Sequence, residues 1–112
     1  MHKELIDKIR EILEVGVPLH KYGTSSWGLT KEQALKAIEL FHFERIAILG
    51  GDVYVIKKEF ILPNYDNWTC NPVKGESEED FLERSINKAH DYIENYKSNF
   101  EETFYFVLVP NS

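Results

Sequence analysis

One long amphipathic stripe, which begins after Ser77, constrains the fold more than any other feature of the sequence. Ser77 suits a helix N-cap, and the acidic side chains that follow it suit the positive end of the helix dipole. Beyond them, apolar residues recur at the three- and four-residue intervals of one helix face. They are Phe81, Leu82, Ile86, Ala89, Ile93 and Tyr96. Such a stripe needs an apolar surface to cover, and the largest one that this chain can offer is a β-sheet.

Two shorter helices and several strands are predicted around that stripe. Residues 5–13 have a helical period, and a capping box of Thr30 and Gln33 opens a second helix that ends near residues 42–43. The run "IAIL" indicates a strand, "VYVIKKEFIL" a hairpin that turns near residues 58–59 and ends at Pro63, and "TFYFVLVP" a last strand. We therefore expect one domain, residues 1–112, of the α+β class with element order ααβββαβ. Two to three helices should pack on an antiparallel sheet of about four strands, with the last strand in a central place because it is apolar on both faces.

Charge and cysteine content limit the partners and the compartment. The formal net charge is −6, which disfavours nucleic acid and suits a basic protein partner. Cys70 is the only cysteine, so we expect no internal disulfide and a reducing compartment. The N-terminal residues are charged throughout, unlike a signal peptide, and the longest apolar run, residues 104–109, is too short to span a bilayer. The expected location is the cytoplasm, without membrane association.

The stretch "AILGGDVYVI" contains the most motif-like residues of the chain, Gly50, Gly51 and Asp52. A phosphate-binding glycine loop requires a helix after it, whereas the β-like run "VYVI" follows here. The glycine-glycine-aspartate signature of diguanylate cyclases is not matched either, because Val53 and Tyr54 stand where that signature has glutamate and phenylalanine. The sequence therefore predicts a glycine turn or bulge between strands, with Asp52 bonding to nearby backbone N–H groups.

No catalytic or metal-binding pattern emerges from the remaining polar residues. The serines at 25 and 26 lack the glycine-flanked elbow of a serine nucleophile, and a lone cysteine is usually a small buried apolar residue. The histidines share no metal-ligand spacing with one another or with Cys70; they are His2, His20, His42 and His90. We expect no enzymatic activity, no cofactor and no metal.

Two neighbouring segments are candidates for partner binding. The segment "NYDNWTCNP" places Tyr65, Asp66 and Trp68 among turn-forming residues, and aromatic residues in polar loops often anchor interfaces. The alternative is that both rings fold under the loop and cap the core. The acidic run that follows would orient a basic partner, or would simply be the solvated start of a helix; its candidate residues are Glu76, Glu78, Glu79 and Asp80.

The order of these segments resembles a known family. "WGLTKEQALKAIEL" precedes "IAILGGDVYVI", which precedes "NYDNWTCNPVKGESEEDFLERSINKAHDYIENY" and a final apolar strand. From about Trp27 onward the chain resembles the immunity protein 40 family of bacterial polymorphic toxin systems. The resemblance implies a small cytoplasmic antidote that binds and neutralises a cognate toxin domain delivered by another cell, without enzymatic activity.

The sequence alone also allows a function of a different class. Asp52, Tyr54 and Asp66 could surround a pocket in a small ligand-binding or enzymatic α+β domain. A bound small molecule or metal near Asp52 would favour that alternative, whereas a toxin reading frame just upstream would favour the antidote.

Overall fold

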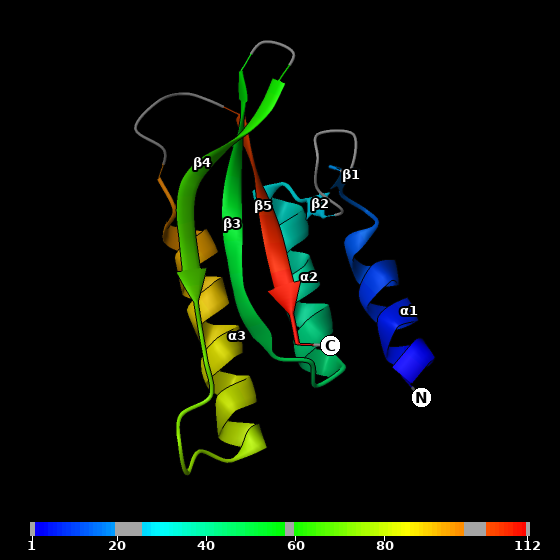
Figure 1. Cartoon of the computed structure of the whole chain (residues 1–112), viewed down its shortest axis with the longest axis vertical. Helices are drawn as coiled ribbons and strands as arrows, with labels where there is room; N and C mark the ends of the chain where they lie inside the picture. Colours follow the sequence, from blue (N-terminus) through cyan, green and yellow to red (C-terminus); the bar gives the residue numbers. More distant parts are fainter. Residues whose placement is uncertain (1, 20–25, 58–59, 98–102, 112) are drawn as a thin grey trace.

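The computed structural model describes residues 2–19, 26–57, 60–97 and 103–111. Three helices and five strands follow one another along these residues (Figure 1). In chain order they are α1 (His2–Leu13), β1 (Val17–Pro18), β2 (Trp27–Gly28), α2 (Lys31–Phe43), β3 (Ile48–Lys57), β4 (Phe60–Thr69), α3 (Glu78–Asn95) and β5 (Thr103–Pro110). The fold is α+β, as the sequence predicted.

The strands form two antiparallel sheets rather than the single sheet of about four strands that was expected. The main sheet has the order β4-β3-β5, and β1 pairs with β2 in a separate short ladder. An isolated bridge between Leu29 and Phe106 joins the chain after β2 to β5. The last strand is therefore an edge of the main sheet, and its predicted central place was wrong. The bridge covers part of its free edge, on the side away from β3.

The two longer helices, α2 and α3, lie side by side against one face of the main sheet, with α1 beside α2 (Figure 1). The predicted stripe of α3 is buried in the core, except for the half-buried Tyr96 that packs at its margin. The buried Ser85 of α3 accepts a hydrogen bond from the Ile48 N–H at 3.0 Å, which ties the start of β3 to this helix. Both predicted N-caps are present, with a full capping box at Thr30 and a Ser77 side chain that accepts from the Asp80 N–H.

The two glycines of "AILGGDVYVI" lie inside β3, so the predicted turn between strands was wrong, whereas a register shift between Ile48 and Gly50 in the β3–β5 ladder fits the predicted bulge. Gly50 has a φ of 153°, and a Cβ added there would overlap the Trp68 carbonyl oxygen. A Cβ at Gly51 would overlap the Trp68 ring and lie 2.6 Å from the Val107 carbonyl oxygen. Neither position therefore has room for a side chain. These glycines let the neighbouring strands and the indole ring approach β3 closely.

Strand β4 extends six residues beyond Pro63, where the sequence placed its end. The pairing of Lys57 with Phe60 confirms the hairpin, while its predicted turn at residues 58–59 lies outside the described residues. The strand continues past these turn-forming residues because β4 pairs with β3 both before and after them: Tyr54 pairs with Pro63 and Asp52 with Asn67. Six of the nine residues of the predicted loop "NYDNWTCNP" thus belong to a strand.

Candidate functional site

A bulge of three residues, 64–66, interrupts the pairing of β4 with β3. We call it the Tyr65 bulge. The ladder pairs Tyr54 with Pro63 and, two residues earlier in β3, Asp52 with Asn67. Three residues of β4 therefore face the single residue Val53 of β3. Tyr65 adopts a φ of 69°, a left-handed conformation that is uncommon outside glycine and is often found at functional sites.

The hydroxyl of Tyr96, just past the end of α3, fixes this bulge. It accepts a hydrogen bond from Asn64 Nδ2 at 2.8 Å and donates one to Asp66 Oδ2 at 2.7 Å. Within the bulge, the Asp66 N–H donates to Asn64 Oδ1 at 2.9 Å. Asn67 Nδ2 adds a bond of 3.0 Å to the Tyr65 carbonyl oxygen. Both residues that flank Tyr65 are thus tied to the helix.

Tyr96 is itself held by aromatic packing. Its ring lies edge-on to Phe104 and Phe106, with centroids 5.1 and 5.5 Å away. Burial, together with the hydrogen bond to Asp66, raises the pKa of Tyr96 to about 12. The hydroxyl therefore stays protonated at neutral pH and remains a donor to Asp66. Tyr65 is 84% exposed, while the hydrogen bonds from Tyr96 hold the residues on either side of it.

Trp68, the second predicted anchor, lies in the core. Only 5% of it is exposed, and its ring stacks on Tyr92 with centroids 4.5 Å apart. Within the described part of the chain, its buried Nε1 has no hydrogen-bond partner. Its burial follows from Gly51, whose missing side chain leaves the space that the indole fills. The sequence left open whether both rings bind a partner or both cap the core. The structure divides them: Trp68 caps the core, and Tyr65 is exposed to solvent.

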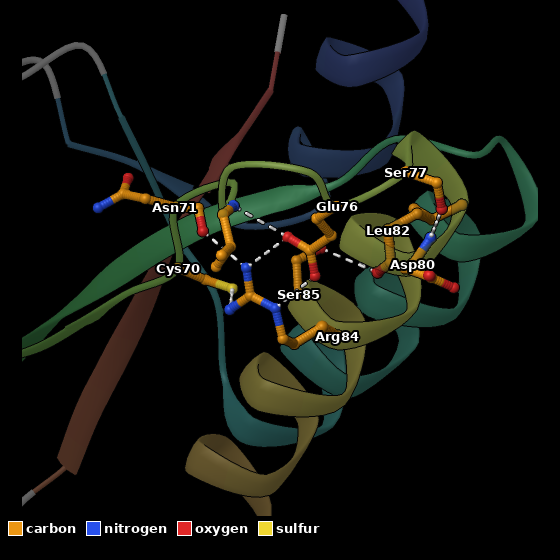
Figure 2. Close-up of polar contacts among 9 residues, drawn as sticks. Cys70, Asn71, Glu76, Ser77, Asp80, Leu82, Arg84 and Ser85 are labelled. Carbon is orange, nitrogen blue, oxygen red and sulfur yellow. Dashed lines mark hydrogen bonds and ion pairs between the residues drawn. The ribbon is translucent and has the colours of Figure 1, made fainter.

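Glu76, the first residue of the acidic run, is held by Arg84 of α3 (Figure 2). Two guanidinium nitrogens of Arg84 bond the two carboxylate oxygens at 2.8 Å, and Nη2 also bonds the Asn71 carbonyl oxygen at 2.6 Å. Nη1 lies 3.2 Å from the buried Cys70 Sγ. The Arg84 bond, with help from the Val73 N–H, lowers the pKa of Glu76 to about 2. With a side chain only 13% exposed, Glu76 serves this bridge rather than an open surface.

The other acidic candidates occupy the first turn of α3. Glu79 forms an ion pair with Arg45, which follows the end of α2. Arg45 has a φ of 60° because it closes α2 in a Schellman motif, with its N–H bonded to the His42 carbonyl and the Ile46 N–H to that of Phe41. Glu78 and Asp80 are exposed, and neither is ion-paired with another residue that the structure describes. We call residues 78–80 the acidic end of α3.

The structure brings these candidates together in two groups, not one. Tyr65 and Asp66 lie beside the C-terminal end of α3, because Tyr96 binds that bulge. Residues 76–80 lie at the N-terminal end of the same helix (Figure 1). Asp80 and Tyr96 are separated by about 24 Å along the helix axis, at a rise of about 1.5 Å per residue. A single small contact patch cannot include both groups.

The alternative pocket around Asp52 and Asp66 gains no support from the geometry. Asp66 is committed to Tyr96, and Asp52 is exposed on β3. Among the described residues, no group of three or more His, Cys, Asp or Glu side chains could hold a metal ion. A search of the same residues finds no helix with the length and apolarity needed to cross a membrane.

Arg84 and Tyr96 are the site residues that sequence reasoning missed. Tyr96 was assigned only to the apolar stripe, and its hydroxyl gave no local sign of a partner 32 residues away. Arg84 lies on the margin of the stripe, three residues after Phe81, and its guanidinium carbon is 5.6 Å from the centre of that ring. An arginine in this position is the one signal that could have indicated a partner in the preceding loop.

These features define a small α+β domain that displays one rigidly held aromatic side chain and, separately, an exposed acidic helix end. The comparison with known families gives the particular group. The family model of Immunity protein 40 matches residues 18–110, and the chain belongs to that family. Membership supports an immunity function and implies a toxin as partner. No curated protein and no solved structure matches the chain.

Proposed function

We propose that this chain neutralises a cognate bacterial toxin domain by binding it through the Tyr65 bulge. Family membership supplies the class of partner, and the exposure of Tyr65 supplies the surface. The toxin belongs to a polymorphic toxin system, its contact surface is basic, and binding takes place in the cytoplasm. Inhibition needs no catalysis, because occupying the toxin's working surface is sufficient.

The observation that carries this proposal is the exposed ring on a fixed backbone. Tyrosine is enriched at interface hot spots, since it contributes a large contact area and a hydroxyl while losing little conformational entropy. Fixing the backbone before binding lowers the entropic cost further. The hydrogen bonds from Tyr96 hold both neighbours of Tyr65, so the ring is presented without a loop having to be ordered.

The other residues of the predicted surface have different roles in this proposal. Asp66 shapes the bulge and places a carboxylate beside Tyr65. Trp68 supports the surface from the core and does not contact the toxin. Glu76 and Glu79 are neutralised by arginine partners, so Glu78 and Asp80 are left to attract a basic toxin surface. At that distance from Tyr65 they act mainly on the rate of association.

Protection of cells tests the proposal. The cognate toxin domain is expressed with the parent chain, with Tyr65→Ala, or with Phe43→Ala. Phe43 is a matched control, because it is 82% exposed, on α2. We expect the parent and Phe43→Ala to restore growth and Tyr65→Ala to fail at equal abundance. A parent chain that gives no protection would refute the immunity role for this toxin, and full protection by Tyr65→Ala would place the contact elsewhere.

A further inference from the structure

A groove between α1 and α2 forms a second surface on a different part of the molecule. The two helices run in opposite directions side by side (Figure 1). The groove has a volume of about 310 Å³. Its apolar lining residues are Ile12, Val15, Ala37 and Leu40. Val15 is 60% exposed and Leu40 38%, so large apolar groups meet water along the groove.

The rim of this groove has a net negative charge. Its charged lining residues are Glu11, Glu32 and Lys36. Lys36 lies 3.6 Å from Glu39 on the same helix, so carboxylates outnumber cations at the rim and beside it. No ion pair links Glu11 or Glu32 to a cation elsewhere in the described part of the chain. The rim therefore has a net negative charge, with one carboxylate on each side of an apolar floor.

The α1 wall of the groove lies outside the family match, which begins at residue 18. The rest of α1 is fastened to the domain: Leu5 and Ile9 pack against the core, and Lys8 Nζ lies 2.7 Å from the Glu44 carboxylate. Gln33 Nε2 also donates to the Val15 carbonyl oxygen at 3.1 Å, which joins the end of α1 to α2. The groove is thus a fixed feature, and the family match does not account for it.

We propose that the α1–α2 groove binds a basic amphipathic helix of a partner protein. The groove extends along α2 from Glu32 to Leu40, which corresponds to about 12 Å, or just over two helical turns. A helix placed there would insert apolar residues spaced i, i+3/i+4 and i+7 between Val15 and Leu40. Lysine or arginine residues beside that stripe would meet Glu11 and Glu32. A second copy of this chain is a poorer occupant, because its net charge of −6 adds repulsion.

Two fluorescent helical peptides test this proposal. They share one leucine stripe and differ only in the polar face, which is lysine in one and glutamate in the other. Fluorescence anisotropy should show the lysine peptide binding at least about tenfold more tightly, as expected for complementary charge around a shared apolar anchor. The double variant Glu11→Lys/Glu32→Lys should reverse the preference.

Leu40→Ser should weaken binding of the lysine peptide by about tenfold or more, and Val15→Ser provides a second variant at a more exposed position. Tyr65→Ala should leave peptide binding unchanged, which separates this groove from the toxin-binding proposal. Equal binding of both peptides, no effect of Leu40→Ser, or a peptide preference that survives charge reversal would overturn the inference. So would self-association in sedimentation that Leu40→Ser abolishes, because the occupant would then be a second copy.

Discussion

At each end of α3 one side chain forms hydrogen bonds to a neighbouring segment, but one network leaves a side chain exposed and the other covers one. At the C-terminal end, Tyr96 binds two residues of the Tyr65 bulge and leaves an aromatic ring exposed. At the N-terminal end, Arg84 binds the chain after β4 and neutralises the carboxylate of Glu76 (Figure 2). In each case one helix side chain fixes a segment of the strand or loop beside it.

The difference shows that a hydrogen-bond network alone does not identify a binding surface. The network at Arg84 closes a loop and removes a charge from the surface, so it serves stability. The network at Tyr96 holds the left-handed backbone of Tyr65 in place, and the Tyr65 side chain is exposed to solvent. Of two equally polar segments, the one that leaves a large side chain unpartnered is the better candidate for recognition.

Trp68→Ala should have the largest effect on stability, because this side chain fills the core between the two ends. Removing a buried indole typically costs about 3–5 kcal/mol of unfolding free energy. Tyr65→Ala, three residues away, should change stability by less than about 0.5 kcal/mol, as is usual for an exposed side chain. Chemical denaturation of the two variants measures both values. Equal stabilities would mean that Trp68 is not a core residue.

Gly51→Ala should have the next largest effect, since the added methyl group overlaps the Trp68 ring and the Val107 carbonyl. Overpacking of this kind costs about 1–3 kcal/mol. Gly75→Ala offers a control without steric overlap, because a Cβ there meets nothing within 4 Å, although its φ of 87° adds backbone strain. Thermal melts should rank parent, Gly75→Ala and Gly51→Ala in falling order. Unchanged melting of Gly51→Ala would contradict the close packing of β3.

Tyr96→Phe separates the display of Tyr65 from the packing beneath it. The variant keeps the ring contacts with Phe104 and Phe106 but loses both hydroxyl bonds to the bulge. We expect a stability loss of about 1 kcal/mol, typical of a lost hydrogen bond, together with weaker toxin binding. Hydrogen exchange at residues 64–66 should rise. Unaltered exchange and binding would show that Tyr96 does not hold the bulge.

Acid titration of the parent beside Glu76→Gln tests the Arg84 end, because the difference between the two chains isolates the Glu76 carboxylate. The pKa of Glu76 falls from an ordinary value of 4.5 to about 2 in the folded chain, so folding favours the ionised carboxylate. Its contribution to stability is complete above about pH 4.5 and is lost as the pH falls towards 2. Glu76→Gln should remove this part of the acid dependence. A variant with the same acid dependence as the parent would contradict the pairing.

The helices and their caps could be predicted because their signals are local. Thr30 and Ser77 cap helices through residues only three positions away. The extent of β4 could not be predicted, because Pro63 and Asn67 favour turns locally and are kept in the strand by pairing with β3. Tertiary pairing overrode local preference in this segment.

The candidate site was predictable in residue type but not in arrangement. The aromatic residues in "NYDNW" indicated a partner-binding segment, which stays a prediction. Which ring is displayed depends on Gly51, which makes room for Trp68, and on the bulge that carries Tyr65. Similarly, Glu76 and Glu78 look alike in sequence, and only the position of Arg84 distinguishes them. Both distinctions arise from long-range contacts.

The most direct test of the central claim is binding kinetics against the cognate toxin domain at two ionic strengths. Tyr65→Ala should weaken binding by about 2 kcal/mol or more, chiefly through faster dissociation, while Phe43→Ala binds like the parent. Glu78→Lys/Asp80→Lys should slow association and reduce its salt dependence with little change in dissociation. A folded Tyr65→Ala variant that associates and dissociates like the parent would contradict the account, because the displayed ring would then not be the anchor.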